Sequence, residues 1–217
     1  NRLGMLVDLS HVSPGVMSRA LSVSQVPVIF SHSSARTLTD VPRNVPDSIL
    51  ARLPRNGGVV MVTFVPGFIS RTVADHNARR RTALADAQRR APADSTAVSR
   101  AMAACGAANP APQATLADVA DHIEHVRRVA GVDHVGIGSD FDGTDNELPV
   151  GLEDVSTFPA LLAELSRRGW SETDLGKVAG ENVLRALARA EEIAARLQRE
   201  RPPSTRTIQE MDRKRAS

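Results

Sequence analysis

The chain has 217 residues with 41% apolar content, which suits one large domain or two small ones with a packed core. The net charge of +2 and the 3% of aromatic residues, with no Tyr, argue against a nucleic-acid-binding protein. The single cysteine, Cys105, excludes an intrachain disulfide and cysteine-based zinc motifs, and no apolar run approaches the ~18 residues of a transmembrane segment.

Short apolar runs alternate with helical patterns along the chain. The runs predict strands at residues 3–10, 26–32, 59–64 and 135–138. The segments between and after them predict helices at residues 14–24, 46–53, 115–130, 155–168 and 172–199. Ser13 before Pro14, and Thr115, are the predicted N-caps. This alternation is typical of a parallel sheet, and four such units fit either an open sheet or half of an eight-unit (β/α) barrel.

Residues 71–113 interrupt the alternation. They are rich in Ala and Arg, and we expect a helical insertion whose arginines lie on solvated helix faces. Residues 200–217 are polar and charged, so we expect a disordered tail. We therefore predict one domain at 1–199, which contains the insertion at 71–113, followed by the tail at 200–217. Because Asn1 lies only a few residues before the first strand, we expect a piece of a longer protein.

Three of the predicted strands end on Ser-His, Ser-His or Ser-Asp. The segments are MLVDLSH at residues 5–11, PVIFSH at 27–32 and HVGIGSD at 134–140. Ligands and catalytic groups collect at the carboxyl ends of parallel strands, and neutral imidazole is a common metal ligand. We therefore predict His11 and His32 as metal ligands, with Asp8 placed to orient a ligating ring. Hydrogen-bonded structural histidines are the competing interpretation, and two histidines are fewer than a zinc hydrolase needs.

Two further residue types complete the candidate site. Asp140, in GSDFDG, is predicted to take a proton from water or to bind a substrate ammonium group, whereas Asp142 before Gly143 is interpreted as turn chemistry. Arg43, in the loop after His32, can clamp a substrate carboxylate with two hydrogen bonds. A plain surface arginine is the alternative interpretation of Arg43.

His122 and His125 lie three residues apart on one predicted helix. Glu124 is not placed as in the HExxH motif of zinc peptidases. Both histidines flank the apolar stripe of the helix, so we expect structural roles for them.

Several ordered segments resemble the membrane dipeptidase (renal dipeptidase-like) family of zinc peptidases, over residues 1 to about 187. They are LGMLVDLSHVS, PVIFSHSSAR, RNVPD, VGIGSDFDG with GLEDVSTFPAL, and GENVLRAL. The resemblance implies an α/β fold that is part of a TIM-type (β/α)8 barrel of the metal-dependent hydrolase kind, about its last four β/α units. It implies cleavage of dipeptides by a metal-bound hydroxide at a two-zinc centre. It also implies that His11 and His32 ligate one zinc, that Arg43 holds the substrate carboxylate, and that Asp140 lies near the substrate amine and the attacking water.

The chain also departs from that family. The family's His-x-Asp pair and metal-bridging Glu lie upstream of the matched region, and no His-x-Asp occurs in the 217 residues. Only one side of a binuclear Zn²⁺ site is therefore expected here. The hypotheses are a zinc dipeptidase, a truncated or degenerate inactive homologue, and an unrelated metal-free α/β binding domain. The expected partner is a dipeptide substrate, a homodimer is left open, and the sequence does not indicate a localisation.

Overall fold

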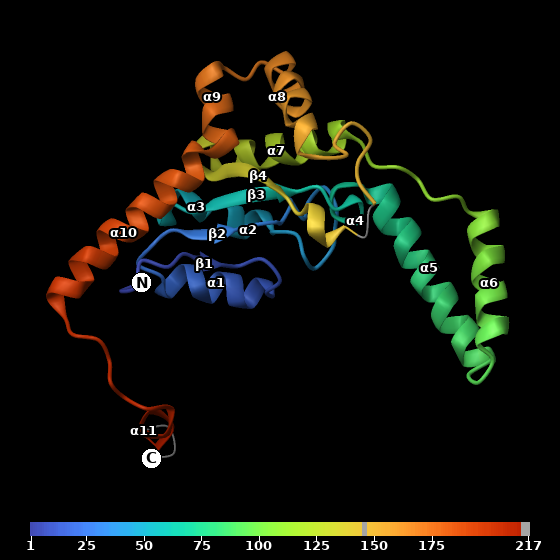
Figure 1. The fold of residues 1–217 in the computed structure, drawn as a ribbon, viewed down its shortest axis with the longest axis horizontal. Helices are drawn as coiled ribbons and strands as arrows, with labels where there is room; N and C mark the ends of the chain where they lie inside the picture. The colour runs from blue at the N-terminus through green and yellow to red at the C-terminus, as the bar shows by residue number, and fades with distance from the viewer. Residues whose placement is uncertain (145–146, 214–217) are drawn as a thin grey trace.

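The structure is a computed structural model that describes residues 1–144 and 147–213. Its centre is a four-stranded parallel sheet with helices packed on it and a helical hairpin projecting from one end (Figure 1). Residues 145–146, which follow the GSDFDG segment, and residues 214–217 of the predicted tail lie outside the described residues. No helix within the described ranges combines the length and the apolar character needed to cross a bilayer.

The strands lie in the order β1-β2-β3-β4, and all neighbouring pairs are parallel. Their bounds are β1 Val7–Asp8, β2 Val28–Phe30, β3 Val59–Thr63 and β4 Val135–Ser139. Consecutive strands of a (β/α) barrel are neighbours in this way, whereas a doubly wound sheet reverses its order at a switch point. The prediction of an α/β fold is confirmed, and the strand order is that of a partial barrel.

β1 and β2 are shorter than their apolar runs predict. Leu9 and Val26 lie outside the strands yet are buried at 2% and 0% exposure. An apolar pattern reports burial, and burial here extends beyond the residues assigned to the strands, as at Leu9, whose N–H still donates to the Ile29 carbonyl oxygen of β2 at 2.8 Å. The two predicted runs therefore mark the right elements but overestimate their lengths.

Helices connect and cover the strands. They are α1 Pro14–Val23, α2 Asp47–Leu50, α3 Leu53–Asn56, α4 Pro66–Ile69, α5 Arg71–Arg90, α6 Ser95–Ala108, α7 Leu116–Ala130, α8 Phe158–Arg167, α9 Glu172–Gly176, α10 Asn182–Glu200 and α11 Ile208–Arg213. Ser13 caps α1, and Thr115 forms a capping box with Asp118 at the start of α7, as predicted. The helix predicted at 46–53 is instead α2 and α3, because Pro54 has no N–H to continue a helix. The helix predicted at 172–199 is α9 and α10, joined by a π-helical turn.

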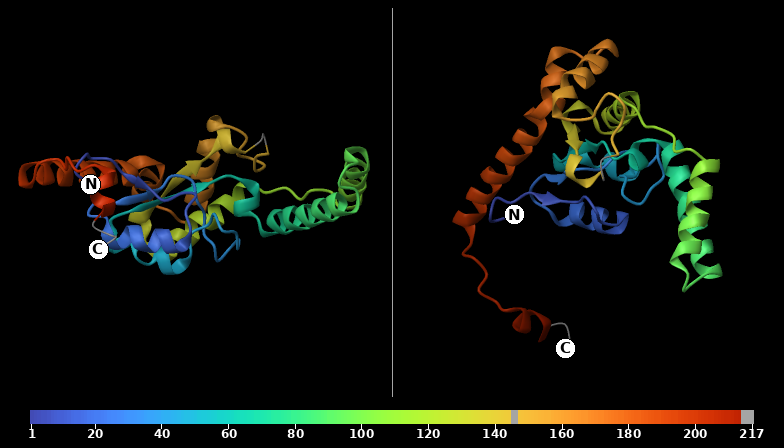
Figure 2. Two further views of the ribbon diagram at one scale, coloured as in Figure 1. Left: turned by 90° about the horizontal axis from the view of Figure 1, so that it is seen from below. Right: turned by 45° about the vertical axis from the view of Figure 1, so that its right-hand side comes forward.

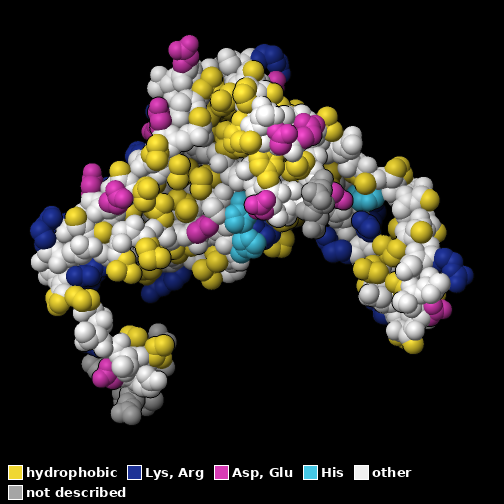
Figure 3. All heavy atoms as spheres, viewed as in Figure 1, with side chains coloured by type: hydrophobic (Ala, Val, Ile, Leu, Met, Phe, Trp, Pro, Cys, Tyr) yellow, Lys and Arg dark blue, Asp and Glu magenta, His cyan; other side chains and the backbone are white. Residues whose placement is uncertain are grey.

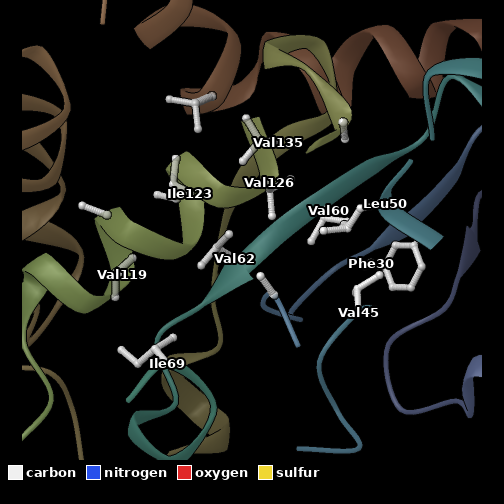
Figure 4. Close-up of a cluster of buried hydrophobic side chains, with 14 of the residues drawn as sticks. Phe30, Val45, Leu50, Val60, Val62, Ile69, Val119, Ile123, Val126 and Val135 are labelled. Atoms are coloured by element: carbon white, nitrogen blue, oxygen red, sulfur yellow. The ribbon is translucent and has the colours of Figure 1, made fainter. Parts of the chain in front are cut away.

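The main core lies between the sheet and α7. Figure 4 shows Val60 and Val62 of β3 among the side chains of Ile123 and Val126, which come from α7. All four are fully buried, so the apolar stripe predicted for this helix is the face that covers the sheet. A second, smaller cluster forms where α10 packs against the amino-terminal side of the strands. Its members are Val26, Ala190, Ile193 and Leu197.

α5 and α6 form the projecting hairpin, and Figure 2 shows it extending away from the sheet in two further views. The buried residues of α5 are Val73 and His76, both in its first two turns, and α6 contributes none within the described chain. Both helices fall in the segment expected to be a helical insertion. α11 lies in the segment expected to be a disordered tail.

Candidate metal centre

The two candidate histidines meet at the carboxyl ends of β1 and β2. Their Nε2 atoms are 2.7 Å apart, and their rings lie edge to face with centroids 4.8 Å apart. The nitrogens approach one another from two separate strand ends, so His11 and His32 are able to bind one cation between them when both lone pairs are free. Figure 3 shows histidine side chains gathered near the middle of the displayed face, beside acidic side chains.

Left-handed backbone is concentrated at these strand ends. Among the described non-glycine residues, a positive φ occurs at His11 (71°), Ser139 (43°) and Asp140 (73°). This conformation is disfavoured for residues with a Cβ and tends to persist where function requires it. Here it ends β4 directly before Asp140 and turns the chain at His11, so it sets the direction of two candidate side chains.

The Asp140 carboxylate lies close enough to His11 and to Arg43 to act electrostatically on both. Desolvation and the nearby Arg43 and His32 lower the pKa of His11, whereas Asp140 and Asp8 act in the opposite direction. Burial lowers the pKa of Arg43, and Asp140 again opposes the shift. A lowered His11 pKa favours the neutral ring, which is the form that binds metal. The structure thus brings together all four sequence-predicted site residues: His11, His32, Arg43 and Asp140.

A glycine makes room for the Asp140 carboxylate. A Cβ on Gly143 would lie 2.5 Å from Asp140 Oδ1, so any larger residue would displace the carboxylate. Gly143 ends the short 3₁₀ turn Phe141–Gly143, in which Asp142 is exposed. This placement agrees with the turn interpretation of Asp142. The ring of Phe141 packs edge to face on Phe64 at 5.7 Å and holds the turn against the core.

Arg43 presents unpaired donors. Its guanidinium carbon lies 5.1 Å from the centre of the Phe68 ring. Its buried Nε and Nη2 atoms have no hydrogen-bond partner among the described residues. Unpaired buried donors on a cation are costly, and a planar guanidinium matches a carboxylate through two parallel hydrogen bonds. The site therefore offers a place for an anionic group of a ligand.

Asn44 fixes the loop that carries Arg43. Its buried amide accepts a hydrogen bond from Ser34 N (3.1 Å) and donates to the carbonyl oxygens of Thr39 (2.9 Å) and Phe68 (2.7 Å). These three bonds join Ser34 and Thr39 of the loop to Phe68, whose ring lies beside the Arg43 guanidinium. Our sequence reasoning missed Asn44, although an amide inside the RNVPD segment was a usable signal for a structured loop.

His122 and His125 have the structural roles predicted for them. His122 Nδ1 accepts from Ala35 N at 2.9 Å, and His122 Nε2 bonds to the carbonyl oxygen of Ile69 at 3.1 Å. Burial lowers the pKa of His122 to about 4. His125 Nε2 lies 2.8 Å from Asp47 Oδ1. The link from His122 to Ala35, three residues beyond His32, was not foreseen.

The residues present fit part of a metal site. Two imidazole nitrogens that converge from rigid strand ends are suitable zinc ligands, but zinc takes at least three protein ligands in catalytic sites. Within residues 1–144 and 147–213, no group of three or more His, Cys, Asp or Glu side chains is arranged to hold a metal ion. Parallel strands in barrel order, with these groups at their carboxyl ends, define the chain as part of a barrel of the metal-dependent hydrolase class.

Comparison with known proteins identifies the family. A model of the membrane dipeptidase family, peptidase family M19, matches residues 1–201. The chain belongs to this family. It is 42% identical over 195 residues to an uncharacterised dipeptidase of Schizosaccharomyces pombe, covering 89% of this chain and 38% of that protein. It is also 42% identical over 197 residues to the dipeptidase ataJ of Aspergillus terreus, covering 91% of this chain and 39% of that protein.

Solved structures agree with the family assignment. The probable dipeptidase PvdM from Pseudomonas aeruginosa superposes with a TM-score of 0.71 at 27% identity, covering 88% of this chain and 51% of that one. A metallopeptidase from Rhodobacter sphaeroides, liganded with a phosphinate mimic of the dipeptide L-Ala-D-Ala, gives 0.65 at 26% identity and covers 87% and 43%. The chain thus spans less than two fifths of the length of the two curated relatives.

Proposed function

We propose that the chain carries one side of the zinc site and the substrate clamp of a dipeptidase that hydrolyses the peptide bond of dipeptides. The single observation that carries the proposal is the convergence of His11 and His32 Nε2 at 2.7 Å, at strand ends of a chain that belongs to the membrane dipeptidase family. His11 and His32 would hold one Zn²⁺ of a binuclear centre. Bound zinc would acidify a water molecule and polarise the scissile carbonyl.

The remaining residues suit the two ends of a dipeptide. Arg43, with unpaired buried donors, would bind the terminal carboxylate of the substrate through two hydrogen bonds. Asp140, which lies near both Arg43 and His11, would hold the substrate ammonium group and accept a proton from the attacking water. A cationic and an anionic group at one site select a short zwitterionic substrate, because a longer peptide cannot place both of its ends there.

Zinc binding and turnover test the proposal directly. We expect the full 217-residue chain to bind zinc and His11→Ala and His32→Ala each to weaken that binding at least tenfold, because each removes one ligand nitrogen. Zinc content by elemental analysis, affinity by competition with a chromophoric chelator, and hydrolysis of alanyl-alanine are the measurements. His134→Ala is the matched control, because His134 bonds to the Gly58 carbonyl oxygen, away from the site. Unchanged zinc affinity in both site variants would refute the ligand assignment.

An inactive homologue is the second candidate. The observation that favours it is the absence, within the described ranges, of a third metal-binding side chain beside the two histidines. Under this alternative the chain binds zinc weakly and does not hydrolyse dipeptides. Tight zinc binding with turnover by the chain alone would exclude it, whereas micromolar or weaker binding without turnover would support it.

A further inference from the structure

A chain of hydrogen bonds runs from the candidate metal centre back into β1. His32 Nδ1, the ring nitrogen that faces away from His11, lies 2.7 Å from Ser31 Oγ. Ser31 Oγ in turn forms a short hydrogen bond to Asp8 Oδ2. Asp8 belongs to β1 and Ser31 follows β2, so the contact joins two neighbouring strands behind the metal-facing nitrogen.

The Asp8 carboxylate fixes the direction of the hydrogen bonds that link Asp8, Ser31 and His32. Ionised Asp8 has only acceptors, and a hydroxyl has a single proton. If the Ser31 proton pointed to His32, the Ser31 and Asp8 oxygens would face each other at hydrogen-bonding distance with no proton between them. The Ser31 hydroxyl therefore donates to Asp8. Its other potential acceptor, Ser10 Oγ, is 3.5 Å away. Ser31 Oγ is then left to accept from the ring, which requires a proton on His32 Nδ1.

Asp8 is held in its ionised form by its surroundings. Partial burial would raise the pKa of Asp8, but hydrogen bonds from the Ser31 hydroxyl and from the backbone N–H groups of Ser10 and Ser31 outweigh burial and lower it. Those backbone bonds measure 3.0 and 3.1 Å to Asp8 Oδ1. The two backbone bonds thus hold Asp8 Oδ1 in place, while Asp8 Oδ2 accepts the hydrogen bond from the Ser31 hydroxyl.

We infer that Asp8, acting through the Ser31 hydroxyl, is a positioning residue that holds His32 in the Nδ1–H tautomer and leaves the Nε2 lone pair free for metal. This inference rests on the proposed function, because it assigns His32 Nε2 as a zinc ligand. The hydrogen bond made by one ring nitrogen of a histidine sets the state of the other. Loss of such an outer partner typically weakens metal affinity by about 10–100-fold.

The first test is the tautomer of His32 in the metal-free chain. Long-range ¹H–¹⁵N correlation spectra at pH 8.5 report which ring nitrogen carries the proton, and His32→Gln identifies the signal. We expect the wild-type ring to be protonated on Nδ1. Ser31→Ala should shift it toward the Nε2–H form and weaken zinc binding by about 10–100-fold, whereas Ser31→Thr, which keeps a hydroxyl, should restore both properties.

Ser10→Ala is the matched control. Ser10 Oγ accepts a hydrogen bond from the backbone N–H of His32 at 3.1 Å but bonds to neither ring nitrogen. The variant should keep the Nδ1–H tautomer. A wild-type ring protonated on Nε2, or an unchanged tautomer in Ser31→Ala, would overturn the inference. Failure of the wild-type chain to bind zinc would instead defeat the proposed function. The inference that Asp8 and Ser31 set the His32 tautomer would still be supported if the Nδ1–H tautomer were lost only in Ser31→Ala.

Discussion

At the scale of single residues, Arg43 has guanidinium donors that make no hydrogen bond to the described part of the chain. Its Nε and Nη2 atoms are buried and have no hydrogen-bond partner among the described residues, although its guanidinium carbon lies over the Phe68 ring. An arginine held in place with unused donors is suited to recognise an anion. Our sequence reasoning placed Arg43 in the site but kept a surface arginine as an alternative, because exposure cannot be read from a loop sequence.

Arg43→Met tests the recognition of the substrate carboxylate. The substitution keeps an unbranched side chain against Phe68 and removes the charge. Losing hydrogen bonds to a charged group costs about 1.5–3 kcal/mol, so kcat/KM for alanyl-alanine should fall by about 10–100-fold. With alanyl-alanine amide, which has no terminal carboxylate, the wild type and Arg43→Met should have similar kcat/KM values. Equal losses for the two substrates would contradict carboxylate binding by Arg43.

At the scale of elements, the loop between β2 and α2 is organised by buried polar side chains. Asn44 bonds to three backbone groups of the loop and of α4, and His122 of α7 joins Ala35 to Ile69. These partners lie up to 87 residues apart in the chain. Periodicity and capping signals are local, so they predicted α1, α7 and the four strands but not these long-range hydrogen bonds. The Asp8–Ser31 contact escaped sequence reasoning for the same reason.

His122 makes the stability of this arrangement depend on pH. Its folded pKa of about 4 lies below the ordinary histidine value of 6.5, so the unfolded state binds more protons than the folded state between these two pH values. Stability is therefore full above about pH 6.5 and is lost as the pH falls toward 4. The free energy of unfolding should drop by about 2 kcal/mol between pH 7.5 and 5 from this residue alone.

Urea denaturation of the wild type and of His122→Gln measures this contribution. The variant should be less stable at pH 7.5, because the buried ring and its hydrogen bonds are lost. The difference between the two proteins should shrink by about 2 kcal/mol at pH 5. A constant difference at the two pH values would mean that His122 accepts a proton as easily in the folded state as in the unfolded state.

At the scale of the whole molecule, the sheet has two outer strands. β1 and β4 each have one strand neighbour within the described chain, and Leu3 and Met5, just before β1, are 75% and 66% exposed. Unpaired strand edges and exposed apolar side chains favour association with further structure. The curated relatives that the chain matches are more than twice as long. The chain offers two candidate zinc ligands, His11 and His32, where a catalytic zinc site takes at least three protein ligands. This number agrees with a partial barrel.

The projecting hairpin is predicted to be separable from the barrel portion. From residue 78 onward, α5 and α6 bury no described residue in the core. Asn77 and Ala111 line the same pocket, so a short linker can join the two ends. Replacing residues 78–110 with the four-residue linker Gly-Ser-Gly-Ser should change the free energy of unfolding by less than about 1 kcal/mol. The reason is that changes at exposed positions, away from the core, cost little stability. Zinc affinity should be unchanged.

Ile123→Ala provides the reference for a change in the core. Ile123 is fully buried against the sheet, so its truncation should cost about 2–5 kcal/mol. Urea denaturation followed by circular dichroism measures all three proteins. If the hairpin deletion destabilises the chain as much as Ile123→Ala, then α5 and α6 belong to the cooperative folding unit. The proposed division into a barrel portion at 1–199 and an insertion at 71–113 would then be wrong.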